Sequence, residues 1–158
     1  MALFLSTFIN KVDRKGRVSV PATFRAALKG QSFNGVVAFR SYREAAIEAC
    51  AMDRMEQFSA GLDALDQFSD DQDALASTIF ADAHQLALDG DGRVVLPPLL
   101  SEHARIADSA AFVGRGATFQ IWNPAAFERH QAGARARALA RGATLRLGPR
   151  AGQSEERP

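Results

Sequence analysis

The chain has 158 residues, of which 47% are hydrophobic and 23% are charged, a composition typical of a folded domain. With 19 basic and 18 acidic residues, its formal net charge of +1 argues against a protein that is basic throughout. One cysteine, Cys50, excludes an internal disulfide and a multi-cysteine zinc site, and no hydrophobic run approaches the roughly 20 residues of a membrane helix. These features predict a cytoplasmic protein of one domain, or of two small domains that share a core.

In the first half of the chain, hydrophobic periodicity and turn residues predict a strand over residues 7–12, a tight turn, a short second strand and a helix over 21–28. Two further strands are expected over 35–39 and 46–49, followed by a helix that begins at about Asp53.

The middle of the chain is acidic. Residues 1–43 contain eight basic residues and one acidic residue, residues 44–92 contain one basic and twelve acidic residues, and residues 93–158 contain ten basic and five acidic residues. Hydrophobic residues at helical spacing, and a helix start at Ser69, predict helices in the acidic segment. Two interpretations stay open for it: a face exposed to solvent, or a contact with the basic segment of a neighbouring subunit. The basic first segment itself indicates either a site for a polyanion or a solvated face.

The second half predicts the same order of elements: a strand over 85–88, a turn, a short strand, a helix from Pro97 to about Ile106, and strands over 111–113 and 119–122. A last helix is expected from residue 123 or 124 to about Arg141.

A sequence repeat explains this similarity. The run D-R-K-G-R-V-S-V-P at residues 13–21 recurs as D-G-D-G-R-V-V-L-P at residues 89–97. The aspartate can accept backbone N–H groups of the turn, the glycine permits positive φ, and the proline ends the strand and suits the first helical position. The alternating hydrophobic residues after each arginine should point to one core. Two copies of one strand-turn-strand-helix unit are therefore expected.

The paired motifs, one in each half of the chain, resemble those of the MraZ family of bacterial regulators, and the unit that carries them resembles the AbrB/SpoVT swapped-hairpin fold. The resemblance implies an α+β fold in which two tandem βα units form a pseudo-dimeric, mostly β core flanked by short helices. The expected divisions are a first unit at 1–60, a helical linker at 61–82, a second unit at 83–141 and a disordered tail at 142–158. A family-typical opening, Met-Phe-x-Gly, reads here as residues 3–6, Leu-Phe-Leu-Ser.

The same resemblance implies a cytoplasmic, nucleoid-associated transcriptional regulator. Such a protein binds double-stranded DNA at tandem repeats upstream of its own division and cell-wall operon, as a ring-shaped homo-oligomer. The DNA-binding residues carried over to this sequence are Arg14, Lys15, Gly16 and Arg17, and the motif residues with a structural role are Asp13, Pro21, Asp89, Gly92, Arg93 and Pro97. Arg17 is the first candidate for base reading, since arginine can bond guanine in the major groove. The alternative is that Arg17 pairs with an acid and braces the hairpin.

The second loop, at residues 89–93, has a net charge of −1, whereas the first, at 13–17, has +2. Phosphate repulsion disfavours it as a primary DNA contact, so a structural role or a subunit interface is expected. An antitoxin-type interaction protein with the same DNA-binding fold is the alternative function. The sequence contains no convergent catalytic set, and we expect no enzyme activity, metal, cofactor, small-molecule substrate or membrane partner.

Overall fold

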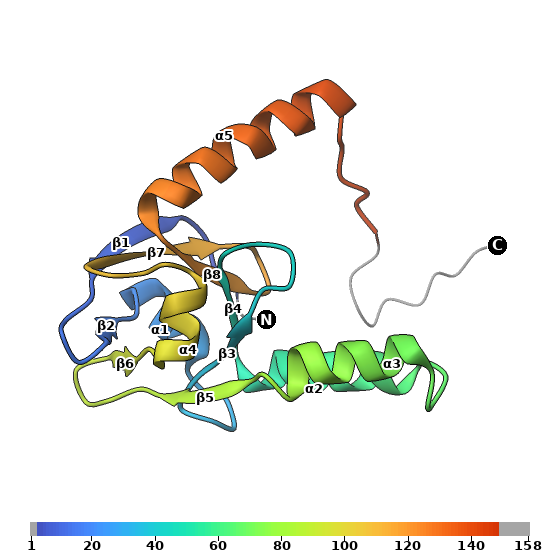
Figure 1. Cartoon of the computed structure of the whole chain (residues 1–158), viewed down its shortest axis with the longest axis horizontal. Coiled ribbons are helices and arrows are strands. Elements are labelled where there is room, and N and C mark those ends of the chain that lie inside the picture. Colours follow the sequence, from blue (N-terminus) through green and yellow to red (C-terminus); the bar gives the residue numbers. More distant parts are fainter. Residues whose placement is uncertain (1–2, 149–158) are drawn as a thin grey trace. The chain divides into compact units, whose positions relative to one another are not determined.

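The two halves of the chain contribute the same series of elements. The computed structural model describes residues 3–148. The first half contains β1 (Thr7–Lys11), β2 (Arg17–Ser19), α1 (Ala22–Leu28), β3 (Gly35–Arg40), β4 (Ile47–Cys50) and α2 (Met52–Asp63). The helices α3 (Asp70–Leu75) and η1 (Ala76–Phe80, a π-helix) follow, and the second half contains β5 (His84–Ala87), β6 (Arg93–Val95), α4 (Pro98–His103), β7 (Ser109–Gly114), β8 (Phe119–Trp122) and α5 (Pro124–Arg141). Figure 1 shows these elements in sequence colours.

Strands of the two halves are exchanged within one antiparallel sheet. Its order is β1-β7-β8-β4-β3-β5, and a separate two-stranded ribbon pairs β2 with β6. The order reads the same from both ends when the halves are interchanged, with β4 and β8 at the centre. Each outer strand therefore pairs with a strand of the other half: β1 with β7, and β5 with β3. This exchange confirms the predicted α+β class with a pseudo-dimeric, mostly β core.

The main core lies between one face of the six-stranded sheet, the β2–β6 ribbon and helices α1 and α4. Its members are fully or nearly fully buried, and they include Phe24 of α1, Leu100 of α4, Phe112 and Phe119. The rings of Phe24 and Phe119 lie 5.0 Å apart between centroids, within the range in which aromatic pairs attract.

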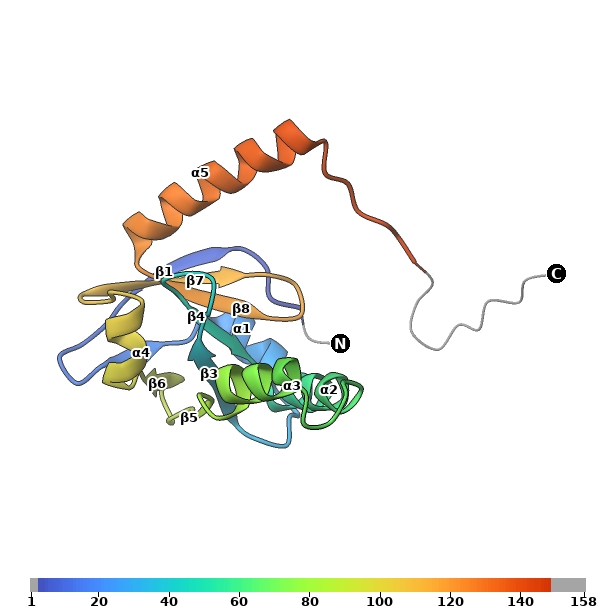
Figure 2. The same cartoon turned by 45° about the vertical axis from the view of Figure 1, so that its right-hand side comes forward.

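The opposite face of the sheet is covered as well. Met55 of α2 and residues of η1 pack on Val37, Phe39 and Cys50 of β3 and β4. Figures 1 and 2 show α2 and α3 lying together, away from β2 and β6. The ribbon and α2 thus belong to opposite faces of the sheet.

The chain divides into two compact parts, one that ends at Phe127 and one that begins at Glu128. In the first part, Phe127 packs against Trp122 with a centroid separation of 5.7 Å. In the second part, the helix continues to Arg141, and residues 143–148 form no regular structure. The rest of the predicted tail, residues 149–158, lies outside the described residues.

Helix boundaries differ from the expected ones by small shifts. Each motif proline lies at the N-cap, one residue before the first helical residue, because Pro21 and Pro97 both keep extended ψ angles of 142° and 145°. Helix α4 ends at His103 and not near Ile106. Arg105 adopts a φ of 54°, and the Ile106 N–H then bonds the Ser101 carbonyl at 2.9 Å, which closes the helix end.

The segment before β1 contains one residue in an unfavourable conformation. Ser6 has a φ of 75°, in the left-handed region that favours glycine. The conformation is held from both sides, since the Gly114 N–H bonds the Ser6 carbonyl at 2.8 Å and the neighbouring Phe4 is fully buried.

Candidate nucleic-acid interface

The first motif loop is organised by one aspartate. Oδ1 of Asp13 accepts the backbone N–H groups of Lys15 and Arg17, both at 2.9 Å, and Oδ2 lies 2.6 Å from Nε of Arg17. The Gly16 N–H bonds the Asp13 carbonyl at 3.0 Å, and Gly16 takes a φ of 80°. The positive φ predicted for this glycine is confirmed, and the carboxylate satisfies the donors that the tight turn leaves free.

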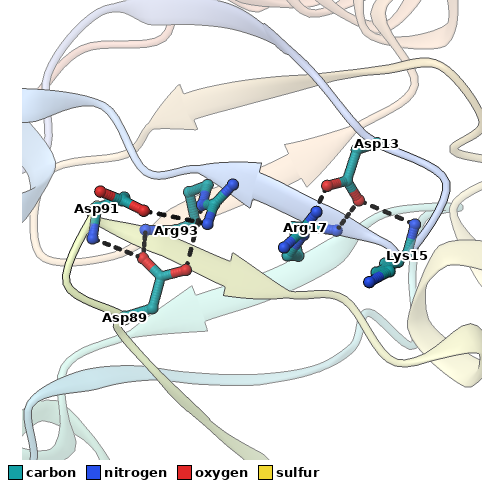
Figure 3. Close-up of polar contacts among 6 residues, drawn as sticks. All are labelled: Asp13, Lys15, Arg17, Asp89, Asp91 and Arg93. Atoms are coloured by element: carbon teal, nitrogen blue, oxygen red, sulfur yellow. Dashed lines mark hydrogen bonds and ion pairs between the residues drawn. The ribbon is translucent and has the colours of Figure 1, made fainter.

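The second loop repeats this geometry. Oδ1 of Asp89 accepts the backbone N–H groups of Asp91 and Arg93 at 2.9 Å, and Oδ2 lies 3.1 Å from Nε of Arg93. Gly92 has a φ of 76°. Figure 3 shows the two loops at opposite ends of the ribbon. Their backbones are equivalent, so a functional difference between them must come from their side chains.

In both loops the aspartate pKa is lowered. For Asp13 the main cause is the hydrogen bond from the Arg17 backbone N–H, and for Asp89 it is the matching bond from Arg93. Both bonds favour the charged carboxylate. The aspartates are therefore fixed acceptors that hold the loop.

The two loops differ in the charge of their side chains. Lys15 occupies the position that Asp91 occupies in the second copy. The Asp91 carboxylate lies 3.2 Å from Nη2 of Arg93, so the guanidinium of Arg93 is paired with two acids. The guanidinium of Arg17 is paired with Asp13 alone, through Nε, among the residues that the structure describes. The N–H groups of its two terminal nitrogens are therefore available as hydrogen-bond donors to a ligand.

The structure thus shows the bracing role considered for Arg17. It leaves room for a second role, because the pair with Asp13 uses Nε and not the terminal nitrogens that make bidentate bonds to a base. Arg14 and Lys15 are exposed beside it. The three basic side chains and Gly16 lie in one turn, as the sequence predicted for a loop, whereas their contact with DNA stays a prediction.

The outer face of the ribbon connects the two loops. Val18 and Val94 point into the core, as predicted, so strand alternation turns Arg17, Ser19, Arg93 and Val95 outward. Register places Arg17 opposite Val95 and Ser19 opposite Arg93. A spacing of two residues along the strand and one strand separation put the two arginine Cα atoms about 8 Å apart.

Two residues near the loops escaped the sequence reasoning. Arg25 of α1 bonds the Val20 carbonyl at 2.6 Å, and a Cβ added to Gly92 would meet its Cδ at 2.7 Å, so its side chain covers the second loop. Val95 is 52% exposed. The sequence signal for Val95 was strand alternation. Because Val94 points inward, the next residue points to solvent, where a polar side chain is usual and Val95 is hydrophobic.

Within residues 3–148, no group of three or more His, Cys, Asp or Glu side chains could hold a metal ion. Cys50 is buried, and this burial raises the pKa of its thiol to about 12, so the thiol favours its protonated form. In that same part of the chain, none of the helices combines the length and the apolar character that a bilayer crossing requires.

The sequence is similar to one protein family and to several of its members. A family model described as "MraZ protein, putative antitoxin-like" matches residues 79–146. The chain is 46% identical over 144 residues to the transcriptional regulator MraZ of Pelagibacter ubique, an alignment that covers 91% of this chain and 93% of that protein. It is 48% identical over 130 residues to the protein of the same name from Rickettsia akari, covering 82% and 87% of the two chains. For the protein from Rickettsia bellii strain OSU 85-389 the identity is 46% over 147 residues, with 92% and 98% covered.

Proposed function

The chain belongs to the MraZ family of transcriptional regulators, and from this premise we propose that it binds tandem DNA repeats upstream of its own division and cell-wall operon. Contact is made by the first motif loop, through Arg14, Lys15, Gly16 and Arg17, in each subunit of a ring-shaped homo-oligomer. The protein acts without a cofactor, as a cytoplasmic, nucleoid-associated regulator.

The observation that supports this assignment is the difference between two loops of the same backbone geometry. Lys15 replaces the acid that pairs with Arg93 in the second copy, and this leaves the first loop with basic groups available to phosphates. The second loop presents carboxylates, which phosphates repel. One loop of each chain is therefore suited to DNA, and the other is suited to a structural role.

Each residue of the first loop has a distinct part. The terminal nitrogens of Arg17 make a bidentate contact to O6 and N7 of guanine in the major groove. Lys15 and Arg14 contact phosphates, which position the protein without specifying sequence. Asp13 holds the loop through its three bonds, and Gly16 provides the turn.

One loop gives few phosphate contacts, so useful affinity requires several subunits on spaced repeats. A ring supplies this through effective concentration, because binding of one loop brings the next loop close to the next repeat. We also propose that residues 1–60 and 83–141 are the two tandem units, with 61–82 as the linker. The exchange of strands between the halves supports their origin as a duplicated unit.

The test is a DNA-binding titration with a fragment from the region upstream of the gene. The compared proteins are the wild type, Arg17→Ala and the matched control Arg93→Ala, which removes the equivalent arginine from the second loop. We expect Arg17→Ala to weaken binding at least about fivefold, since a good bidentate base contact contributes about 1–3 kcal/mol and 1.4 kcal/mol corresponds to a factor of about ten. Arg93→Ala should change binding much less. Wild-type binding should weaken steeply with salt.

Thermal unfolding of both variants controls for damage to the loop, because each arginine braces its own aspartate. Equal binding by the wild type and a folded Arg17→Ala variant would show that the proposed contact is wrong. An Arg17→Lys variant separates charge from base reading, because lysine keeps the charge but not the planar fork.

A further inference from the structure

Val95 lies on the solvent face of the ribbon, directly opposite Arg17 in the β2–β6 register. It follows Val94, which is buried, and its own side chain is 52% exposed. The corresponding position in the first copy is Ser19. A hydrophobic residue therefore stands on a face whose other outward positions are polar.

Val95 also adjoins the loop that carries the proposed DNA contacts. Its Cγ1 lies 3.8 Å from the position that a Cβ on Gly16 would occupy. The other methyl-bearing residues of the ribbon, Val18 and Val94, point into the core. Val95 thus presents the only hydrophobic side chain on the outer face of β2 and β6, two strands that the structure describes in full.

We propose that Val95 contacts the C5 methyl group of a thymine adjacent to the guanine that Arg17 reads, and so helps to determine the DNA sequence bound. This inference rests on the proposed function, because it requires the first loop to enter the major groove. It assigns a base-reading residue to the second half of the chain, although the loop of that half is unsuited to DNA.

The dimensions and the chemistry of the groove support the assignment. A two-stranded ribbon fits the major groove, and side chains directly opposite each other on a ribbon are about 5 Å apart at Cβ. Stacked base pairs are about 3.4 Å apart, so opposite side chains can reach neighbouring base pairs. The thymine methyl is the hydrophobic group on the major-groove edge, and a branched hydrophobic side chain is a suitable partner for it. Charge complementarity comes from Arg14, Lys15 and Arg17 alongside.

The experiment removes the methyl group from the DNA and the hydrophobic side chain from the protein. The upstream fragment is amplified once with thymidine triphosphate and once with deoxyuridine triphosphate, which differ at that methyl alone. Wild-type protein should bind the uracil fragment about fourfold more weakly for each engaged loop, the factor that corresponds to burial of one methyl group. Val95→Ala should bind both fragments with nearly equal affinity.

Two further variants serve as controls for the preference for thymine. Val95→Thr keeps a methyl group at the same branch point and should retain much of the preference for thymine. Leu99→Ala removes an exposed hydrophobic side chain from α4 and should leave the preference unchanged. The ratio between the two fragments is compared within each variant, so a general loss of stability cancels.

The outcomes separate this inference from the proposed function. If the wild type binds neither fragment, the proposed function is wrong, and this inference fails with it. If the wild type binds both fragments equally and Arg17→Ala binds both more weakly than the wild type does, DNA binding by the first loop stands and the role of Val95 is overturned. A preference for thymine that persists in Val95→Ala overturns it as well, because the methyl is then read elsewhere.

Discussion

Asp91→Lys would give the second loop the charge pattern of the first. The substitution removes the carboxylate that lies 3.2 Å from Nη2 of Arg93 and places an ammonium where the first loop has Lys15. Asp89 still holds Nε of Arg93 at 3.1 Å, and the backbone N–H of residue 91 can still bond Asp89, so the turn should persist. Because Asp91 is 78% exposed, the lost ion pair should cost at most about 1 kcal/mol in the free energy of unfolding.

The increase in DNA affinity can be estimated from the number of phosphates neutralised. The substitution makes each subunit more positive by two charges, enough for one phosphate contact by the new lysine and one by the released guanidinium of Arg93. Each added phosphate contact makes the slope of log affinity against log salt steeper by about 0.9. A fourfold rise in salt should therefore weaken the variant by about 3.5-fold more than the wild type for each phosphate that is newly neutralised.

The assay is a salt series of titrations with the upstream fragment. The matched control is Glu56→Lys on α2, which makes the same change in charge on an exposed residue behind the sheet. We expect Asp91→Lys to bind more tightly at low salt and with a steeper slope, and Glu56→Lys to change both quantities less. If the affinity of the control rises as much as that of Asp91→Lys, net charge explains the effect, and the reasoning about the second loop is refuted.

Three other outcomes follow from single residues. Ser6→Gly should raise the free energy of unfolding by about 1 kcal/mol in a denaturant titration, because Ser6 is held at a φ of 75°; an unchanged or lower value would contradict the strain. The lowered pKa of Asp13 stabilises the fold fully above the ordinary aspartate pKa of about 3.9, and this contribution is lost as pH falls through the folded pKa. The unfolding free energy of Asp13→Asn should therefore fall less steeply below about pH 4 than that of the wild type. Identical pH profiles for the two proteins would argue against the bond from Arg17. The Cys50 thiol, with its pKa raised to about 12, should react with an alkylating reagent at about pH 8 far more slowly in the native protein than in urea, and equal rates would contradict its burial.

Local features of this chain could be predicted because short-range rules decide them. The turn requires positive φ at Gly16 and Gly92, and strand alternation sends Val18 and Val94 inward whatever the rest of the chain does. The beginning of α3 is similar, since Ser69 accepts the Gln72 N–H at 3.1 Å as a helix cap.

The pairing of segments far apart in the chain could not be predicted from such local rules. Strand patterns do not say that β1 pairs with β7 rather than with β2, and the family resemblance, not the periodicity, led to the exchanged arrangement. The π-helical turn of η1 and the early end of α4 at a left-handed Arg105 have no signal in residue type. The position of Val95 opposite Arg17 depends on ribbon register, which links two segments that are far apart in the sequence.

The register also gives a physical role to the copy whose loop is acidic. The Leu96 N–H bonds the Gly16 carbonyl at 2.9 Å, and the Val20 N–H bonds the Gly92 carbonyl at 3.0 Å. Each loop is therefore anchored by the strand end of the other copy. The second unit therefore fixes the position of the first loop through backbone bonds, and these bonds depend on its turn geometry and not on the charge of its loop. The two loops can therefore share one backbone conformation and still differ in the charge of their side chains.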